Sequence, residues 1–148
     1  MTAFTENGFW VKGWVETELG NFKDAVCALE KCVEMSMANK NRACEAIGRV
    51  CLGTAMFKED ASTYSQAEAT ILQGLQICSE LGLRPFYAEG CLRLGELYAD
   101  AGQKKKSLEQ LRKAEGMFRE MGMDYWLRKT QPLLEKLEAS VNKAPATK

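Results

Sequence analysis

The run LGELYADAGQKKKSLEQLRKA, residues 94–114, decides the fold, because it consists of two helical segments joined by a tight turn. Gly95 lies in the first segment, and Ser107, Leu111 and Ala114 lie in the second. Positions i, i+4 and i+7 share one face of a helix, so that face carries a small, a large apolar and a small residue. The small residues let a neighbouring helix approach closely, and the large one fills the space between them. The run therefore predicts a tightly packed helical hairpin.

The same pattern occurs twice more, earlier in the chain. Second segments with the order small, large, small are found at Ala25-x3-Leu29-x2-Cys32 and at Ala67-x3-Ile71-x2-Gly74. A glycine lies within the first segment of each hairpin, at Gly13, Gly53 and Gly95, which are 40 and then 42 residues apart. Glycine in a helix interior costs roughly 1 kcal/mol relative to alanine, so close packing is the expected compensation. Hairpins of this kind bury their apolar faces by stacking on one another.

Glycines also mark the ends of predicted helices. In Leu81-Gly82-Leu83 and Met121-Gly122-Met123, a glycine followed by an apolar residue is typical of a left-handed cap. We expect seven helices, near residues 7–19, 22–38, 42–59, 63–81, 85–101, 104–121 and 125–140. The predicted architecture is all-α, with hairpins at about 7–38, 42–81 and 85–121 and a closing helix at 125–140. We expect one domain over residues 1–141 and a disordered polar tail over 142–148.

Composition narrows the possible partners and compartments. The 20 basic and 20 acidic residues cancel, whereas a general nucleic-acid binder needs a surplus of Lys and Arg, so we expect no nucleic-acid partner. No apolar run approaches the roughly 20 residues that span a bilayer, and the N-terminus lacks a signal-peptide pattern. We therefore expect no membrane association and a cytoplasmic location. The six cysteines form no CxxC and lie in helical segments, so we interpret them as reduced core residues.

The residues that common catalytic sites need are missing. The chain has no histidine, which excludes Ser-His-Asp and Cys-His pairs and every metal site that contains histidine. Glu96 and Asp100 are four residues apart and could form an acid–base pair, but a solvated helix face explains them more simply. Cys44 and Cys51 are two helical turns apart, about 10 Å, which is too far to share one zinc ion. We expect no enzymatic activity, no cofactor and no metal site.

The hairpins resemble the tetratricopeptide repeat family, whose signature is W-x2-L-G-x2-Y, then A-x3-F, then P. Leu94-Gly95-x2-Tyr98 matches the first part, with Cys91 at the place of the Trp, and Gly20–Ala25 is close to the family's turn between helices. The period is longer than the family's 34 residues. The endings Glu80–Leu83 and Glu120–Met123 are similar to those of C-terminal helical arrays in bacterial signalling ATPases and nucleotide cyclases. The resemblance implies a right-handed α-α superhelix with a concave groove.

In that family, the first helix of each unit lines the groove and contacts a bound protein. The resemblance therefore implies a non-catalytic scaffold that binds a peptide or helix of a protein partner. The alternative is a regulatory, sensory or oligomerisation segment of a signalling ATPase or nucleotide cyclase system. Mapped onto this chain, the candidate contact residues are Trp10, Trp14, Thr17, Val50, Thr54, Phe57, Lys58, Leu92 and Glu96.

The first hairpin carries a concentration of aromatic residues. Trp10 and Trp14 are four residues apart and share a helix face, so they form either a hot spot for a partner or a packing contact within the fold. Terminal repeats need a polar outer face, and Phe4, Phe9 and these two tryptophans do not provide one. A homodimer through the first hairpin is therefore a third possibility.

Overall fold

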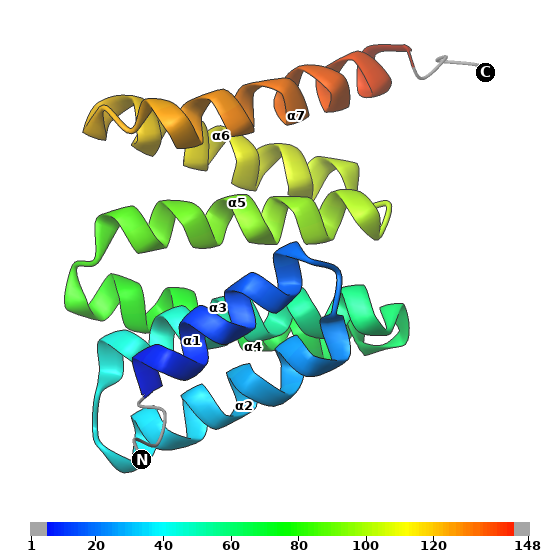
Figure 1. Cartoon of the computed structure of the whole chain (residues 1–148). Helices are drawn as coiled ribbons and strands as arrows, with labels where there is room; N and C mark the ends of the chain where they lie inside the picture. Colours follow the sequence, from blue (N-terminus) through cyan, green and yellow to red (C-terminus); the bar gives the residue numbers. More distant parts are fainter. Residues whose placement is uncertain (1–5, 144–148) are drawn as a thin grey trace. The chain divides into compact units, whose positions relative to one another are not determined.

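The computed structural model describes residues 6–143, which form seven α-helices and one short 3-10 helix (Figure 1). The elements are α1 (Glu6–Glu18), α2 (Phe22–Ala38), α3 (Arg42–Glu59), η1 (Ala61–Thr63), α4 (Tyr64–Leu81), α5 (Arg84–Asp100), α6 (Lys104–Met121) and α7 (Asp124–Lys143). The predicted all-α fold of helical hairpins is confirmed. The main difference is that α7 continues to Lys143 instead of ending at residue 140. The rest of the predicted tail, like Phe4, lies outside the described residues.

The chain divides into two compact units, Met1–Leu83 and Arg84–Lys148. The single domain over residues 1–141 stays a prediction. In the first unit, α1 packs on α2, α2 on α3 and α3 on α4, and α1 also contacts α3. In the second unit, α5 packs on α6 and α6 on α7, and α5 also contacts α7. In the first unit, α1 therefore lies beside α3, the first helix of the next hairpin. In the second unit, α5 lies beside the closing helix α7.

Each predicted glycine contact is present in the structure. The Cβ atom of an alanine at Gly53 would lie 2.5 Å from Cγ1 of Ile71, and one at Gly95 would lie 2.6 Å from Cδ2 of Leu111. At Gly13 the added atom would collide with the side chain of Leu29. The large residue of every small–large–small set is thus the one that packs on the glycine. This contact closes each hairpin, and the set's residues are fully or almost fully buried.

The turns after the helices use a left-handed residue, as predicted for Gly82 and Gly122, whose φ angles are 70° and 68°. The N–H group of Leu83 donates a hydrogen bond to the carbonyl of Cys78 at 2.9 Å, across the end of α4. Gly20 and Gly102 adopt the same conformation in the turns within their hairpins. These bonds satisfy carbonyl groups that a helix end leaves without partners.

The turn between α2 and α3 is built differently, because Lys40 takes the left-handed conformation, with φ of 57°. The left-handed conformation costs a residue with a side chain about 1–2 kcal/mol, and glycine avoids this cost. Glycine also has more conformational freedom in the unfolded chain, which offsets about 0.5–1 kcal/mol of the stabilisation. We expect Lys40→Gly to raise the free energy of unfolding by about 0.5–1 kcal/mol. Urea denaturation would measure this, with Gly82→Ala as the opposite change. A Lys40→Gly variant less stable than the wild type would contradict the expectation.

The predicted core role holds for four cysteines, since Cys32, Cys44, Cys78 and Cys91 are buried. The Sγ atoms of Cys32 and Cys44 are 3.8 Å apart between α2 and α3. Burial, with a smaller effect of the neighbouring Cys44, raises the pKa of the Cys32 thiol to about 12, so it stays protonated and behaves as a small apolar group. Cys27, by contrast, is exposed. Among residues 6–143, no helix combines the length and apolar character that a membrane span requires.

Candidate interaction groove

One face of α5 carries four ionisable side chains at helical spacing: Glu89, Arg93, Glu96 and Asp100. The facing side of α7 carries aromatic, apolar and polar residues, namely Trp126, Lys129, Leu133, Lys136, Leu137 and Ser140. Residues separated by three, four or seven positions share a helix face, so each helix presents a continuous row. We call the surface formed by these ten residues the α5–α7 groove.

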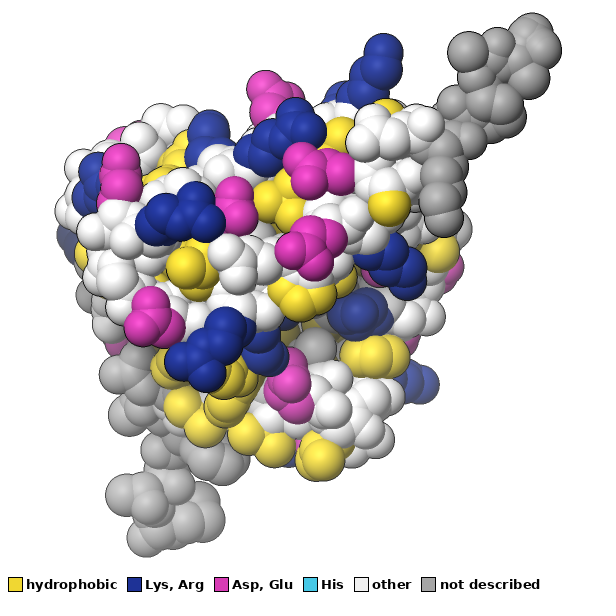
Figure 2. Space-filling view, turned by 90° about the horizontal axis from the view of Figure 1, so that it is seen from above, with side chains coloured by type: hydrophobic (Ala, Val, Ile, Leu, Met, Phe, Trp, Pro, Cys, Tyr) yellow, Lys and Arg dark blue, Asp and Glu magenta, His cyan; other side chains and the backbone are white. Residues whose placement is uncertain are grey.

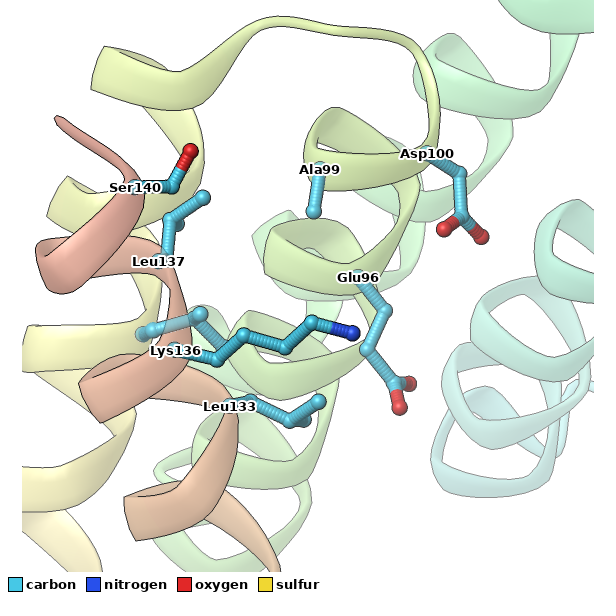
Figure 3. A pocket seen from close by; sticks show the side chains of 8 residues that line it. Glu96, Ala99, Asp100, Leu133, Lys136, Leu137 and Ser140 are labelled. Carbon is cyan, nitrogen blue, oxygen red and sulfur yellow. The ribbon is translucent and has the colours of Figure 1, made fainter. Parts of the chain in front are cut away.

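The groove contains a hollow of about 270 Å³ at the end where Asp100 and Ser140 lie. Its apolar lining comes from all three helices of the second unit, with Ala99 on α5, Leu111 on α6, and Leu133 and Leu137 on α7. Figure 3 shows the side chain of Lys136 extending from α7 toward Glu96. The hollow therefore combines an apolar floor with charges of both signs at its rim.

Arg93 organises the other half of the groove. Its guanidinium group lies 3.2 Å from a carboxylate oxygen of Glu96 and 3.9 Å from one of Glu89. The same group lies over the ring of Trp126, 5.7 Å from its centre, where the electron-rich face attracts a cation. Burial raises the pKa of Glu89, and the charges of Arg93 and Lys129 counteract this only in part. These contacts hold α5 and α7 together beside the hollow.

Trp126 fixes α7 to the hairpin below it. Its ring stacks on that of Phe118, with 6.1 Å between ring centres and an angle of 21° between planes. Phe118 is fully buried in α6, and Leu134, about two turns after Trp126 on α7, is buried as well. These contacts anchor the closing helix on α6. The α7 side of the groove is therefore held in place by core packing.

Of the nine candidate contact residues, Glu96 is the one that lines the hollow. Val50 and Leu92 were expected on an exposed groove surface, but they are only 5% and 1% exposed, which corrects that expectation. Val50 is buried because its side chain packs against the backbone of Gly74 on α4. Neither side chain is available to a partner.

Several candidate residues of the first unit make contacts within their own helix or hairpin. Thr17 and Thr54 donate hydrogen bonds to carbonyl groups four residues earlier in their own helices, at 2.8 and 3.0 Å. Phe57 contacts the ring of Tyr64 edge-on, with 6.2 Å between ring centres, and Lys58 is exposed. Hydroxyl groups used in this way are occupied by the helix backbone.

The two tryptophans of α1 have different surroundings. Trp10 packs against the core cluster of the first unit, and its indole N–H is buried without a hydrogen-bond partner among the described residues. Trp14 is 43% exposed. Trp10 therefore packs internally, whereas Trp14 lies at the surface.

The α7 half of the groove was not predicted from the sequence, from which this helix was expected only to close the array of hairpins. A usable signal was present, since Leu133 and Leu137 are four residues apart beside Lys136 and Ser140.

Figure 2 shows basic and acidic side chains interspersed on one face of the molecule, with apolar side chains between them. Within residues 6–143, no group of three His, Cys, Asp or Glu residues lies close enough to hold a metal ion.

Comparisons with known proteins agree with this helical architecture. Residues 88–120, which comprise most of α5 and α6, match the family model of the tetratricopeptide repeat. The crystal structure of the apo form of RapI is similar in fold, with a TM-score of 0.77 over 93% of this chain at 17% sequence identity. The chain spans about half the length of that protein, with 49% of it covered. No curated protein sequence gives a significant match. Residues 88–120 are thus similar to a tetratricopeptide repeat, and the likeness to RapI shows the fold of the chain.

Proposed function

We propose that the chain is a non-catalytic interaction module that holds a peptide or helix of a partner protein in the α5–α7 groove. The observation that carries this proposal is the hollow of about 270 Å³ between the first helix of the third hairpin and the closing helix. A hollow with an apolar floor and a few polar groups at its rim is the usual form of a binding site. The tetratricopeptide match over residues 88–120 supports the same role.

The lining of the hollow indicates the chemistry of the bound segment. Leu133 and Leu137, above a floor formed by the buried Leu111, suit one apolar side chain of the partner. The carboxylates of Glu96 and Asp100 suit a basic side chain next to it, because opposite charges across an interface fix register and increase specificity. We therefore expect a peptide or helix in which an apolar residue is followed closely by a basic one.

Selection from a displayed library of random peptides would test the groove without knowledge of the natural partner. Asp100→Lys reverses an exposed charge at the rim of the hollow. Glu109→Lys makes the same change at an exposed position of α6 that does not line the hollow. For peptides selected on the wild type, we expect Asp100→Lys to weaken binding about 10-fold, which corresponds to about 1.4 kcal/mol. Glu109→Lys should bind like the wild type.

Circular dichroism would show that both variants are folded before their affinities are compared. Lys136→Glu provides a second change in the groove, because its side chain lies on the opposite wall. If Asp100→Lys and Lys136→Glu both leave the affinity of every selected peptide unchanged, the groove is not the binding site.

The other predictions about partners do not involve this groove. A homodimer through the first hairpin would use residues of α1, which belongs to the first unit. A regulatory or sensory role in a signalling ATPase or nucleotide cyclase system stays a prediction, as does the cytoplasmic location.

A further inference from the structure

The outer side of α1 carries an apolar surface that the described part of the chain leaves uncovered. Four large side chains on this short helix and on the residue after it are exposed: Val11 by 46%, Trp14 by 43%, Val15 by 41% and Leu19 by 67%. Their spacing places them on one side of the helix, in a band about 140° wide at 100° per residue. We call these four residues the α1 outer face.

The opposite side of α1 is already occupied by the core. Gly13 packs on Leu29 of α2, and Trp10 packs against the core cluster of the first unit. α1 therefore carries apolar side chains both toward the core and away from it, and apolar helix surface is normally covered. The closing helix α7 differs, because its exposed positions include Arg128, Glu135 and other charged or polar residues.

Two charged residues border the α1 outer face in a self-complementary way. Lys12 and Glu18 lie three residues before and three residues after Val15, and therefore about 60° to either side of it around the helix. An oblique two-fold axis through Val15 exchanges these two positions. In such a pair, each Lys12 lies beside the Glu18 of the other copy, and the two Val15 side chains meet at the axis. Within α1, the Nζ atom of Lys12 lies 3.8 Å from a carboxylate oxygen of Glu16, which is a long distance for an ion pair.

We propose that the α1 outer face binds the same face of a second copy of this chain, with the α1 helices crossing at Val15. An interface of this kind is isologous, so one surface must carry both members of each contact pair. The α1 outer face meets this condition, with an apolar centre and one charge of each sign at diagonal corners. The interface lies on α1 and does not depend on the α5–α7 groove.

The size of the face sets the expected strength of the dimer. A stable interface buries about 800 Å² on each partner, and one side of a helix of 13 residues provides less than this. We therefore expect a reversible dimer with a dissociation constant between about 10 µM and about 1 mM. The dimer forms as the protein concentration rises through that range.

Sedimentation equilibrium of the full chain across this concentration range tests the proposal. The wild type should approach twice the monomer mass, whereas Val15→Glu should remain a monomer throughout. Leu72→Glu is a matched control, because Leu72 is 44% exposed on α4, outside the α1 outer face, and it should dimerise like the wild type. A wild type that stays monomeric at the highest concentration overturns the proposal, as does a Val15→Glu variant that still dimerises.

A charge exchange tests the register at Val15. Lys12→Glu alone and Glu18→Lys alone each place like charges together at both corners, and each should weaken the dimer about 10-fold. The double variant restores opposite charges and should dimerise within about 2-fold of the wild type. If the two losses simply add in the double variant, the proposed pairing of Lys12 with Glu18 is wrong. An effect on the folding of α1 alone would not be reversed by the second change.

Discussion

Replacing Gly74 by alanine is expected to lower the free energy of unfolding by about 2–3 kcal/mol, although alanine is the better helix former. The added Cβ atom would lie 2.7 Å from the carbonyl oxygen of Ala46 and 2.9 Å from Cγ2 of Val50. A backbone oxygen cannot turn aside as a side chain can, so α4 must move away from α3. This separation disturbs the close packing of the hairpin.

Gly116 provides the matched control for this change. It also lies within a helix, in α6, but an added Cβ atom would meet no atom within 4 Å. Gly116→Ala should therefore raise the free energy of unfolding by about 1 kcal/mol, the ordinary difference in helix propensity. Urea denaturation of both variants gives the two values. Changes of the same sign at Gly74 and Gly116 would show that close packing at Gly74 is not what selects glycine there.

Truncation of Phe118 to alanine is expected to cost about 3–5 kcal/mol, the largest effect of any single change considered. The side chain is fully buried in α6 and stacks on Trp126, so its removal leaves a cavity beneath α7. We expect α7 to be the part that loosens, because Trp126 loses the ring on which it packs. The α5–α7 groove would be lost with it.

Hydrogen exchange resolved along the sequence would distinguish this outcome from uniform destabilisation. In the Phe118→Ala variant, amides of α7 should exchange faster, while amides of α2 and α3 in the first unit keep their protection. Phe118→Leu retains most of the volume and should cost about 1 kcal/mol. Unchanged exchange in α7 would mean that this helix is held chiefly by other contacts, such as those of Leu134 and Arg93.

The hairpins could be predicted from the sequence because their decisive contacts are encoded at short range. The pattern that places Leu111 between Ser107 and Ala114 also identifies the residue that packs on Gly95. The left-handed turns at Gly82 and Gly122 follow from similarly local chemistry. The left-handed residue at Lys40 could not be predicted, because lysine carries no local preference for that conformation.

The groove was harder to predict, since it depends on which helices pack together. Val50 lies on the first helix of its hairpin, as a groove residue should, but it faces Gly74 of α4 instead of solvent. Spacing along α3 cannot reveal this, because burial is decided by neighbours distant in sequence. The contribution of α7 was missed for the same reason, as Leu133 and Leu137 become a wall only when α5 lies opposite.

The contact between a glycine and one large side chain has a consequence for how such a chain can change over evolutionary time. Each contact lies within a single hairpin, as between Gly53 and Ile71 or between Gly95 and Leu111. A duplicated hairpin therefore contains both residues of the contact that packs its two helices together. New length can be added by tandem duplication without redesign of the parent's interior, while the exposed positions of the copy remain free to diverge toward another partner.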